Sequence, residues 1–204
     1  MLLFLAARVL SAVGNLVALA IFSRMAGPVT YGEYLLIFAW TSIVYGFSTQ
    51  WMRFAFFGVY RREAAGDYIA SFGVLLSIAL VGVAGVLSGL WVVGIAGPEF
   101  LVAVFILLTS MAGYEALLEI SRTRLKAGTV AVLMLLRAGL VIAFGAAALT
   151  MTGSAVSLAF AVALAHAGAA IPGIMAIRDV RLVPSRHAMR SLVVYGWPLL
   201  ISFG

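Results

Sequence analysis

Residues 130–150 read VAVLMLLRAGLVIAFGAAALT, an apolar run with a single charged residue, Arg137. An α-helix rises about 1.5 Å per residue, so a run of this length extends about 30 Å. That distance matches the hydrocarbon core of a lipid bilayer. The run therefore predicts a membrane-spanning helix.

Runs of the same kind recur along the whole chain. The protein has 204 residues, of which 65% are hydrophobic and 10% charged, and its mean hydropathy is +1.18. A soluble domain carries about 25% charged residues, so an ordinary soluble globule is excluded. The other apolar runs are residues 2–22, 34–57, 68–95, 100–118 and 155–177. We predict an all-α, polytopic transmembrane helical bundle with six spans and the start of a seventh.

The basic residues gather in alternate connections between these spans. Nine of the thirteen follow the second, fourth and sixth spans: Arg61, Arg62, Arg122, Arg124, Lys126, Arg178, Arg181, Arg186 and Arg190. The other connections contain only Arg24. The positive-inside rule makes the basic side cytoplasmic, with the N-terminus inside. We read the basic excess as a topology signal and expect no nucleic-acid partner.

The chain is expected to have three parts. Residues 1–177 form a six-helix transmembrane lobe, residues 178–190 form a basic cytoplasmic linker containing Pro184, and residues 191–204 begin a seventh helix. This last piece is too short to span a bilayer. We expect the chain to be the amino-terminal half of a longer protein whose second lobe is missing.

Enzyme chemistry has little support in the sequence. The chain has no cysteine, and it shows no cluster of histidines and carboxylates, no glycine-rich phosphate loop before a lysine and no serine nucleophile motif. We expect no enzymatic activity, no cofactor and no metal.

Titratable residues inside the spans are the candidate functional residues: Arg8, Arg53, Glu115, Arg137 and His166. A charge at the centre of a membrane helix costs about 2.5 to 3.5 kcal/mol, so each needs a partner, a cavity or a route to the interface. Arg53 lies about 7 Å from the cytoplasmic end of its span, within reach of snorkelling. Arg8 and Arg137 lie deeper. Three arginines against one glutamate predict a cationic cavity that binds an anionic head group by paired hydrogen bonds.

Structural alternatives remain open for these residues. Glu115 can pair with Arg137 across adjacent helices. Alternatively, Glu115, Glu119 and Arg122, at i, i+4 and i+7, can form a salt-bridged helix end. His166 has no second ligand at metal spacing, which favours a hydrogen-bonded core residue over a proton relay. Glu115 and His166 are thus coupling or structural residues.

Small residues recur within the spans at helical spacing. One set is Gly82, Gly85 and Gly89, and another is residues 145–147 together with Ala161, Ala163 and Ala165. Small side chains let helix backbones approach closely in lipid. Both sets therefore predict close helix packing.

Two short motifs add a resemblance. Residues 27–34 read GPVTYGEY and follow a first span that contains an arginine, and residues 195–200 read YGWPLL. The chain resembles the polysaccharide-exporter and O-antigen flippase branch of the multidrug/oligosaccharidyl-lipid/polysaccharide superfamily. In that family a Gly-Pro followed by Tyr-Gly-x-Tyr joins the first two helices, and residues 195–200 are similar to the opening of its seventh helix.

The resemblance implies a function as well as a fold. It implies two six-helix lobes around a V-shaped cavity with alternating access, in the bacterial inner membrane. The implied cargo is an undecaprenyl-pyrophosphate-linked oligosaccharide for surface polysaccharide or O-antigen. Arg8 and Arg53 match places in the first two helices where cationic residues engage the pyrophosphate, and we add Arg137 for its depth and sign.

Other functions stay open. A multidrug antiporter of the same superfamily would need an acidic cavity, which three arginines oppose. A non-transporting membrane subunit would have mutually paired intramembrane charges. One lobe cannot alternate access by itself, so we expect a missing carboxy-terminal lobe or a second copy as partner, besides membrane lipid.

Overall fold

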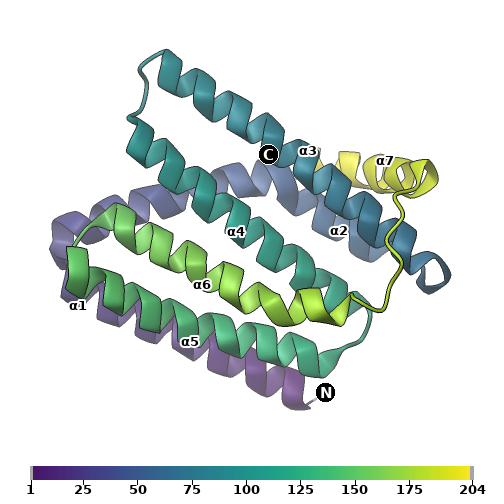
Figure 1. The fold of residues 1–204 in the computed structure, drawn as a ribbon, viewed down its shortest axis with the longest axis horizontal. Helices are drawn as coiled ribbons and strands as arrows, with labels where there is room; N and C mark the ends of the chain where they lie inside the picture. Colours follow the sequence, from purple (N-terminus) through teal and green to yellow (C-terminus); the bar gives the residue numbers. More distant parts are fainter. Residues whose placement is uncertain (1, 203–204) are drawn as a thin grey trace.

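The computed structural model describes residues 2–202, with side chains from residue 5 to residue 198. Its elements are α1 (Leu2–Tyr45), the π-helix η1 (Gly46–Gln50), α2 (Trp51–Val59), the short 3₁₀ helix η2 (Arg62–Ala64), α3 (Ala65–Val92), α4 (Pro98–Thr123), α5 (Ala127–Thr152), α6 (Ala155–Ala176) and α7 (Arg186–Ser202). No strand occurs in this described range. The chain is an all-α helical bundle, as predicted (Figure 1).

The predicted spans are helical apart from residues 93–95 and 177, which follow the ends of α3 and α6. Five helical stretches are long and apolar enough to cross a membrane. The first of these, Leu5–Val59, covers the first two predicted spans from residue 5 onward. The connection expected around residues 23–33 is a kink and not a loop: Gly27 has φ 72° and ψ 169°, and Pro28 follows. Glycine tolerates a positive φ, and proline suits the first position of a helix, so the helix stops and restarts there. We call residues 2–26 and 28–45 the first and second halves of α1.

The connections between helices lie at two ends of the bundle (Figure 1). The N-terminus and the α2–α3, α4–α5 and α6–α7 connections lie at one end, and the kink of α1 and the α3–α4 and α5–α6 turns lie at the other. The nine basic residues of the alternate connections belong to the first end, which we call the basic end. The fold thus gathers in space the charges that the sequence distributes over three connections.

The two sets of small residues behave differently. A Cβ at Gly145 would collide with the ring of Phe22, and Ala163 and Ala165 are buried, so α5 and α6 pack closely with the first half of α1. A Cβ added at Gly82, Gly85 or Gly89 would meet no atom of another helix within 4 Å. The expected close packing is wrong on α3, because small side chains permit a close neighbour but do not supply one.

Helix α7 begins earlier in the sequence than expected. It begins at Arg186 rather than at residue 191, so the non-helical linker ends at residue 185. Its Ala188 and Leu192 are buried in one cluster with Phe56 of α2 and Phe72 of α3. The linker is fixed to α3, because Ser71 Oγ donates to the Ser185 carbonyl (3.2 Å) and accepts from the Ser185 N–H (3.0 Å). The described part of α7 therefore packs on α2 and α3, and its role as the start of a second lobe stays a prediction.

Candidate functional site

Two groups of polar side chains lie between the apolar helices, and α4 contributes to both. The Arg53 cluster consists of Tyr45, Arg53, Glu115, Glu119 and Arg122. The Arg137 cluster consists of Ser11, Asn15, Tyr114, Arg137 and His166. Within this second group, Ser11 and His166 are buried, Arg137 is half-buried and Asn15 is exposed. Consecutive residues on a helix point about 100° apart, so Tyr114 and Glu115 of α4 reach different neighbours.

The Arg53 cluster is an ion-pair network. Arg53 Nη2 lies 2.8 Å from Glu115 Oε2 and 3.6 Å from Glu119 Oε2, and Arg53 Nη1 donates to the Tyr45 hydroxyl at 2.6 Å. Glu119 Oε2 also lies 3.5 Å from Arg122 Nη1. The Arg53 and Glu115 side chains are only 19% and 22% exposed. The sequence suggested that Arg53 extends to the membrane interface, but its guanidinium instead pairs with Glu115 and Glu119.

This network also decides between the alternatives for Glu115. Its ion-pair partner is Arg53 and not Arg137, so that predicted pairing is wrong. The salt-bridged end of α4 is confirmed at Glu119 and Arg122. Glu115 joins that end through Arg53, which contacts both carboxylates.

The π-helix η1 aligns Arg53 with Tyr45. These residues are eight positions apart, and in an α-helix position i+8 lies about 80° around the axis from position i. A π turn closes i→i+5 and so accommodates one extra residue. Arg53 is thereby brought to the direction that position i+7 would have, about 20° from Tyr45. A sequence pattern with a 3.6-residue period does not reveal this register.

The Arg137 cluster contains only neutral partners. Arg137 Nη2 donates to Asn15 Oδ1 at 3.3 Å and to Ser11 Oγ at 3.5 Å, and its guanidinium carbon lies 5.5 Å from the centroid of the Tyr114 ring. Its Nε is buried with no hydrogen-bond partner in the described part of the chain. Among the described residues, no carboxylate forms an ion pair with Arg137. Its positive charge is therefore not neutralised locally.

His166 belongs to the same cluster through Tyr114, whose ring it meets edge-on with centroids 5.5 Å apart. It is buried, and its Nδ1 lies 2.8 Å from the carbonyl oxygen of Val162. A carbonyl only accepts, so Nδ1 carries a proton and donates it to Val162. His166 is thus the hydrogen-bonded core residue that the sequence favours, and a coupling role stays a prediction. No metal-binding group of three His, Cys, Asp or Glu occurs among residues 2–202.

A cavity of about 280 Å³ is lined by residues of both clusters. Its polar lining groups include Asn15, Glu115, Arg137 and His166. Its aromatic lining residues are Phe22, Tyr31, Tyr34 and Phe38, on both sides of the α1 kink. A mainly apolar wall with a few polar groups is typical of small-molecule sites.

The other two predicted arginines lie outside this cavity. Arg53 does not line it and contacts Glu115, which does. Arg8 is exposed on the first half of α1. Arg8, Ser11 and Asn15 are spaced i, i+3 and i+7, so they share one face of the helix. Arg8 therefore lies one turn closer to the basic end than Ser11, on the strip that meets Arg137.

The sequence contained an overlooked signal for this site. Ser11 and Asn15 are polar residues at helical spacing from Arg8 in an apolar span, and intramembrane polar residues face protein or a cavity. Tyr114 and Tyr45 had no such signal, because a tyrosine in a span is also an ordinary interfacial residue.

A third group of charged residues, Arg124, Lys126 and Asp179, lies at the basic end. The carboxylate of Asp179 binds Arg124 through two bonds, from Nη2 (2.9 Å) and Nη1 (3.3 Å), and Lys126 Nζ lies 3.8 Å away. Arg124 and Lys126 also donate to the carbonyl oxygen of Ala176 at 2.8 and 2.6 Å, near the end of α6. The hydrogen bond from Arg124 lowers the pKa of the Asp179 carboxyl below its ordinary value.

Comparison with known proteins assigns no family to this geometry. No protein-family model, curated protein or solved structure matches the chain. The function is therefore argued from the cavity and its charges.

Proposed function

We propose that this chain is one lobe of a membrane transporter, a flippase for lipid-linked oligosaccharide in surface polysaccharide or O-antigen biosynthesis. Its cargo would be the undecaprenyl-pyrophosphate-linked glycan suggested by the resemblance of residues 27–34 and 195–200 to that family. The protein would lie in the bacterial inner membrane with its N-terminus and basic end in the cytoplasm, by the positive-inside rule. In this proposal it is not an enzyme.

The observation that carries the proposal is the uncompensated Arg137 beside a cavity among apolar helices. Burying a cation without an anion is costly, and such residues mark ligand pathways in membrane proteins. A guanidinium binds phosphate oxygens through two parallel hydrogen bonds, which suits a pyrophosphate. Its Nη2 bonds to Asn15 and Ser11 are long, at 3.3 and 3.5 Å, and an anion can replace them.

The neighbouring charges favour an anion over a cationic drug. Glu115 lines the cavity, but Arg53 at 2.8 Å neutralises it, so its carboxylate does not repel a phosphate strongly. Arg8, exposed one helical turn nearer to the basic end, adds a second positive charge on the approach from that side. An acidic cavity for a multidrug antiporter is thereby disfavoured.

The cavity also offers surfaces for the glycan. Tyr31 and Tyr34 line it with ring centroids 6.2 Å apart, and Asn15 supplies an amide. Aromatic faces and amide groups bind the apolar and hydroxyl sides of a sugar. Alternating access would need a second lobe, from a longer protein or from a second copy of this chain.

The experiment measures binding and transport with one pair of variants. Wild-type protein in nanodiscs should bind undecaprenyl pyrophosphate, Arg137→Ala should bind it about 10- to 100-fold more weakly, and Arg181→Ala, in the exposed linker, should bind normally. In a strain lacking the gene, Arg137→Ala should fail to restore surface glycan where Arg181→Ala restores it. Normal glycan display by a well-expressed Arg137→Ala protein would refute the proposal.

A non-transporting membrane subunit is the second candidate, and the Arg53 cluster favours it. That function expects intramembrane charges to be mutually paired, as Arg53 is with Glu115 and Glu119. Under this alternative, Arg53→Ala would lower the amount of assembled protein while Arg137→Ala would leave every phenotype unchanged. Comparing the two variants in one strain separates the two functions.

A further inference from the structure

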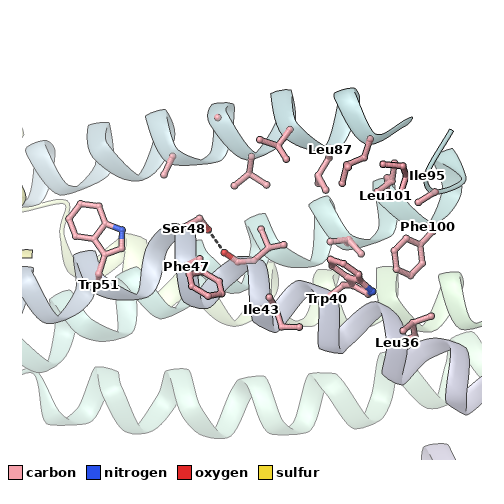
Figure 2. A pocket seen from close by; sticks show the side chains of 18 residues that line it. Leu36, Trp40, Ile43, Phe47, Ser48, Trp51, Leu87, Ile95, Phe100 and Leu101 are labelled. Carbon is pink, nitrogen blue, oxygen red and sulfur yellow. Dashed lines mark hydrogen bonds between the residues drawn. The ribbon is translucent and has the colours of Figure 1, made fainter. Parts of the chain in front are cut away.

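A second hollow lies on the other side of the second half of α1. It is an apolar groove of about 810 Å³ between the second half of α1, η1 and α3, and α4 contributes residues to its wall. Figure 2 shows Leu36, Trp40 and Ile43 along one wall and Leu87 on the opposite wall. Gly82 also lines the groove and has no atom within 4 Å of the place of a Cβ, so a missing side chain helps to form it.

The chemistry of the wall selects a hydrocarbon occupant. Ser48 carries the one side-chain hydroxyl among the lining residues, and it donates to the Val44 carbonyl at 2.6 Å, as the dashed line in Figure 2 shows. Two tryptophan indoles, of Trp40 and Trp51, are the other polar groups of the lining side chains. A ligand with buried polar groups would find few partners here.

The dimensions of the groove are compatible with lipid chains. From Leu36 to Trp51 the groove extends about 22 Å along the helix axis. Spread over this length, about 810 Å³ gives a mean cross-section of about 40 Å². A methylene chain, with carbon contacts near 4 Å, is about 5 Å thick, so two chains fit side by side.

The charges at the far end of the groove favour one class of head group. Glu33 lies one turn before Leu36 on the groove face of α1, and Glu99 directly precedes Phe100 of the wall. Both glutamates are exposed, and neither forms an ion pair with another described residue. Arg24 also belongs to this end, but it lies on the first half of α1, on the other side of the Gly27 kink from Leu36. None of these charged residues is itself among the lining residues. Two carboxylates repel an anionic head group and attract an ammonium group.

We propose that this groove holds the two acyl chains of one bilayer phospholipid whose amine-bearing head group, of the phosphatidylethanolamine class, lies at Glu33 and Glu99. The lipid fills the space between α3 and α1 that the described protein leaves open. It is distinct from the transport cargo, because Leu35 and Phe38 line the Arg137 cavity while Leu36 and Trp40 line the groove. The second half of α1 thus separates the two sites, and this inference does not rest on the proposed function.

Native mass spectrometry of the protein from nanodiscs tests the inference. The nanodiscs contain equal amounts of phosphatidylethanolamine and phosphatidylglycerol and a small fraction of undecaprenyl phosphate. We expect one retained phosphatidylethanolamine on the wild-type protein. Retention of phosphatidylglycerol or of undecaprenyl phosphate instead, or of no lipid, would overturn the proposal.

Two glycines of α3 provide a matched pair of variants. Gly82→Leu fills the groove and should reduce lipid retention at least ten-fold, whereas Gly85→Leu, on the same helix but outside the groove lining, should retain it fully. Both glycines have open space around them, so both variants should keep wild-type helicity and elution volume. Equal retention by the two variants would refute the groove as the site. The double variant Glu33→Gln/Glu99→Gln should keep one lipid but lose the preference for phosphatidylethanolamine, and an unchanged preference would refute the head-group assignment.

Discussion

Arg53 and Arg137 lie on neighbouring sides of α4. They differ in the charge of the side chains that they contact. Arg53 contacts two carboxylates, with Glu115 at 2.8 Å, whereas Arg137 contacts only the neutral side chains of Ser11, Asn15 and Tyr114. Placing either arginine between apolar helices removes water from its charge, which costs free energy. An ion pair with Glu115 offsets this cost for Arg53, whereas Arg137 has no described carboxylate partner and lines a cavity. The first arginine is structural in this interpretation, and the second is available for a ligand.

The largest expected effect follows from removing one member of the ion pair. Arg53→Ala leaves Glu115 as a partly buried carboxylate without its partner, and breaking a buried pair in this way costs about 3 kcal/mol. Arg137→Ala leaves no such charge and should cost only about 1 kcal/mol, as expected for lost hydrogen bonds to neutral groups. The measurement is the free energy of unfolding in mixed micelles with increasing dodecyl sulfate.

A double substitution checks the cause of this difference. Arg53→Met together with Glu115→Met removes both charges and should recover the stability to within about 1 kcal/mol of the wild-type value. Glu119 keeps Arg122 as its ion-pair partner in this variant. If the double variant were as unstable as Arg53→Ala, the loss would come from packing and not from the unpaired carboxylate.

The next effect concerns the geometry of the Arg137 guanidinium. Arg137→Lys keeps the positive charge but loses the planar pair of donors that fits a phosphate. We expect binding of undecaprenyl pyrophosphate to weaken about ten-fold, which is about 1.4 kcal/mol, with an unchanged free energy of unfolding. Calorimetric titration of nanodisc-embedded protein measures the affinity. Equal binding by lysine would show that charge alone, without the two-donor geometry, is sufficient.

A smaller effect is expected from a deletion in the π-helix. Deleting Ser48 from η1 removes the extra residue, and an α-helical turn then places Arg53 seven positions from Tyr45, still about 20° from it. The ion pair should persist, and the free energy of unfolding should change by no more than about 1 kcal/mol. The measurement is the same micelle unfolding titration.

An insertion at the same place is the opposite test of this register. Adding one alanine after Ser48 turns Arg53 about 100° away from Glu115 and should cost as much as Arg53→Ala. If the deletion were as damaging as the insertion, η1 would not be what aligns Arg53 with its partners.

The smallest effect is expected at the basic end. The ion pair there is about as short as that of Arg53 and Glu115, but its carboxylate is exposed. Arg124 and Asp179 are 2.9 Å apart, but the Asp179 side chain is 61% exposed, and exposed pairs contribute little. The pKa of Asp179 is lowered from its ordinary 3.8, so its contribution is present above pH 3.8 and is lost as the pH falls through the lower folded-state pKa. Asp179→Asn should unfold at a slightly lower temperature than wild type at pH 7, and this difference should shrink as the pH falls below 3.8. A difference that does not change with pH would rule out the ion pair as its source.

Part of the site could be predicted because depth and charge are local properties of a span. The sequence identified Arg137, Glu115 and His166, and the structure brings all three to one cavity. It could not assign the partner of Glu115, because Arg53 and Arg137 both lie in the half of their predicted spans that is nearer to the basic end. The choice depends on the direction in which Glu115 points from α4, and on the extra residue that η1 inserts before Arg53.

The sequence by itself determined the helical class, the six apolar spans and the end of the bundle to which each charged connection belongs. These properties follow from hydropathy and charge within a single segment, and lipid leaves a helix as the ordinary way to satisfy the backbone. Tertiary structure decided that a kink at Gly27 joins the first two spans, that Gly145 is covered while Gly82 is open, and that Arg53 is neutralised while Arg137 is not. Each of these depends on which side chain from another helix lies opposite, and no single segment contains that information.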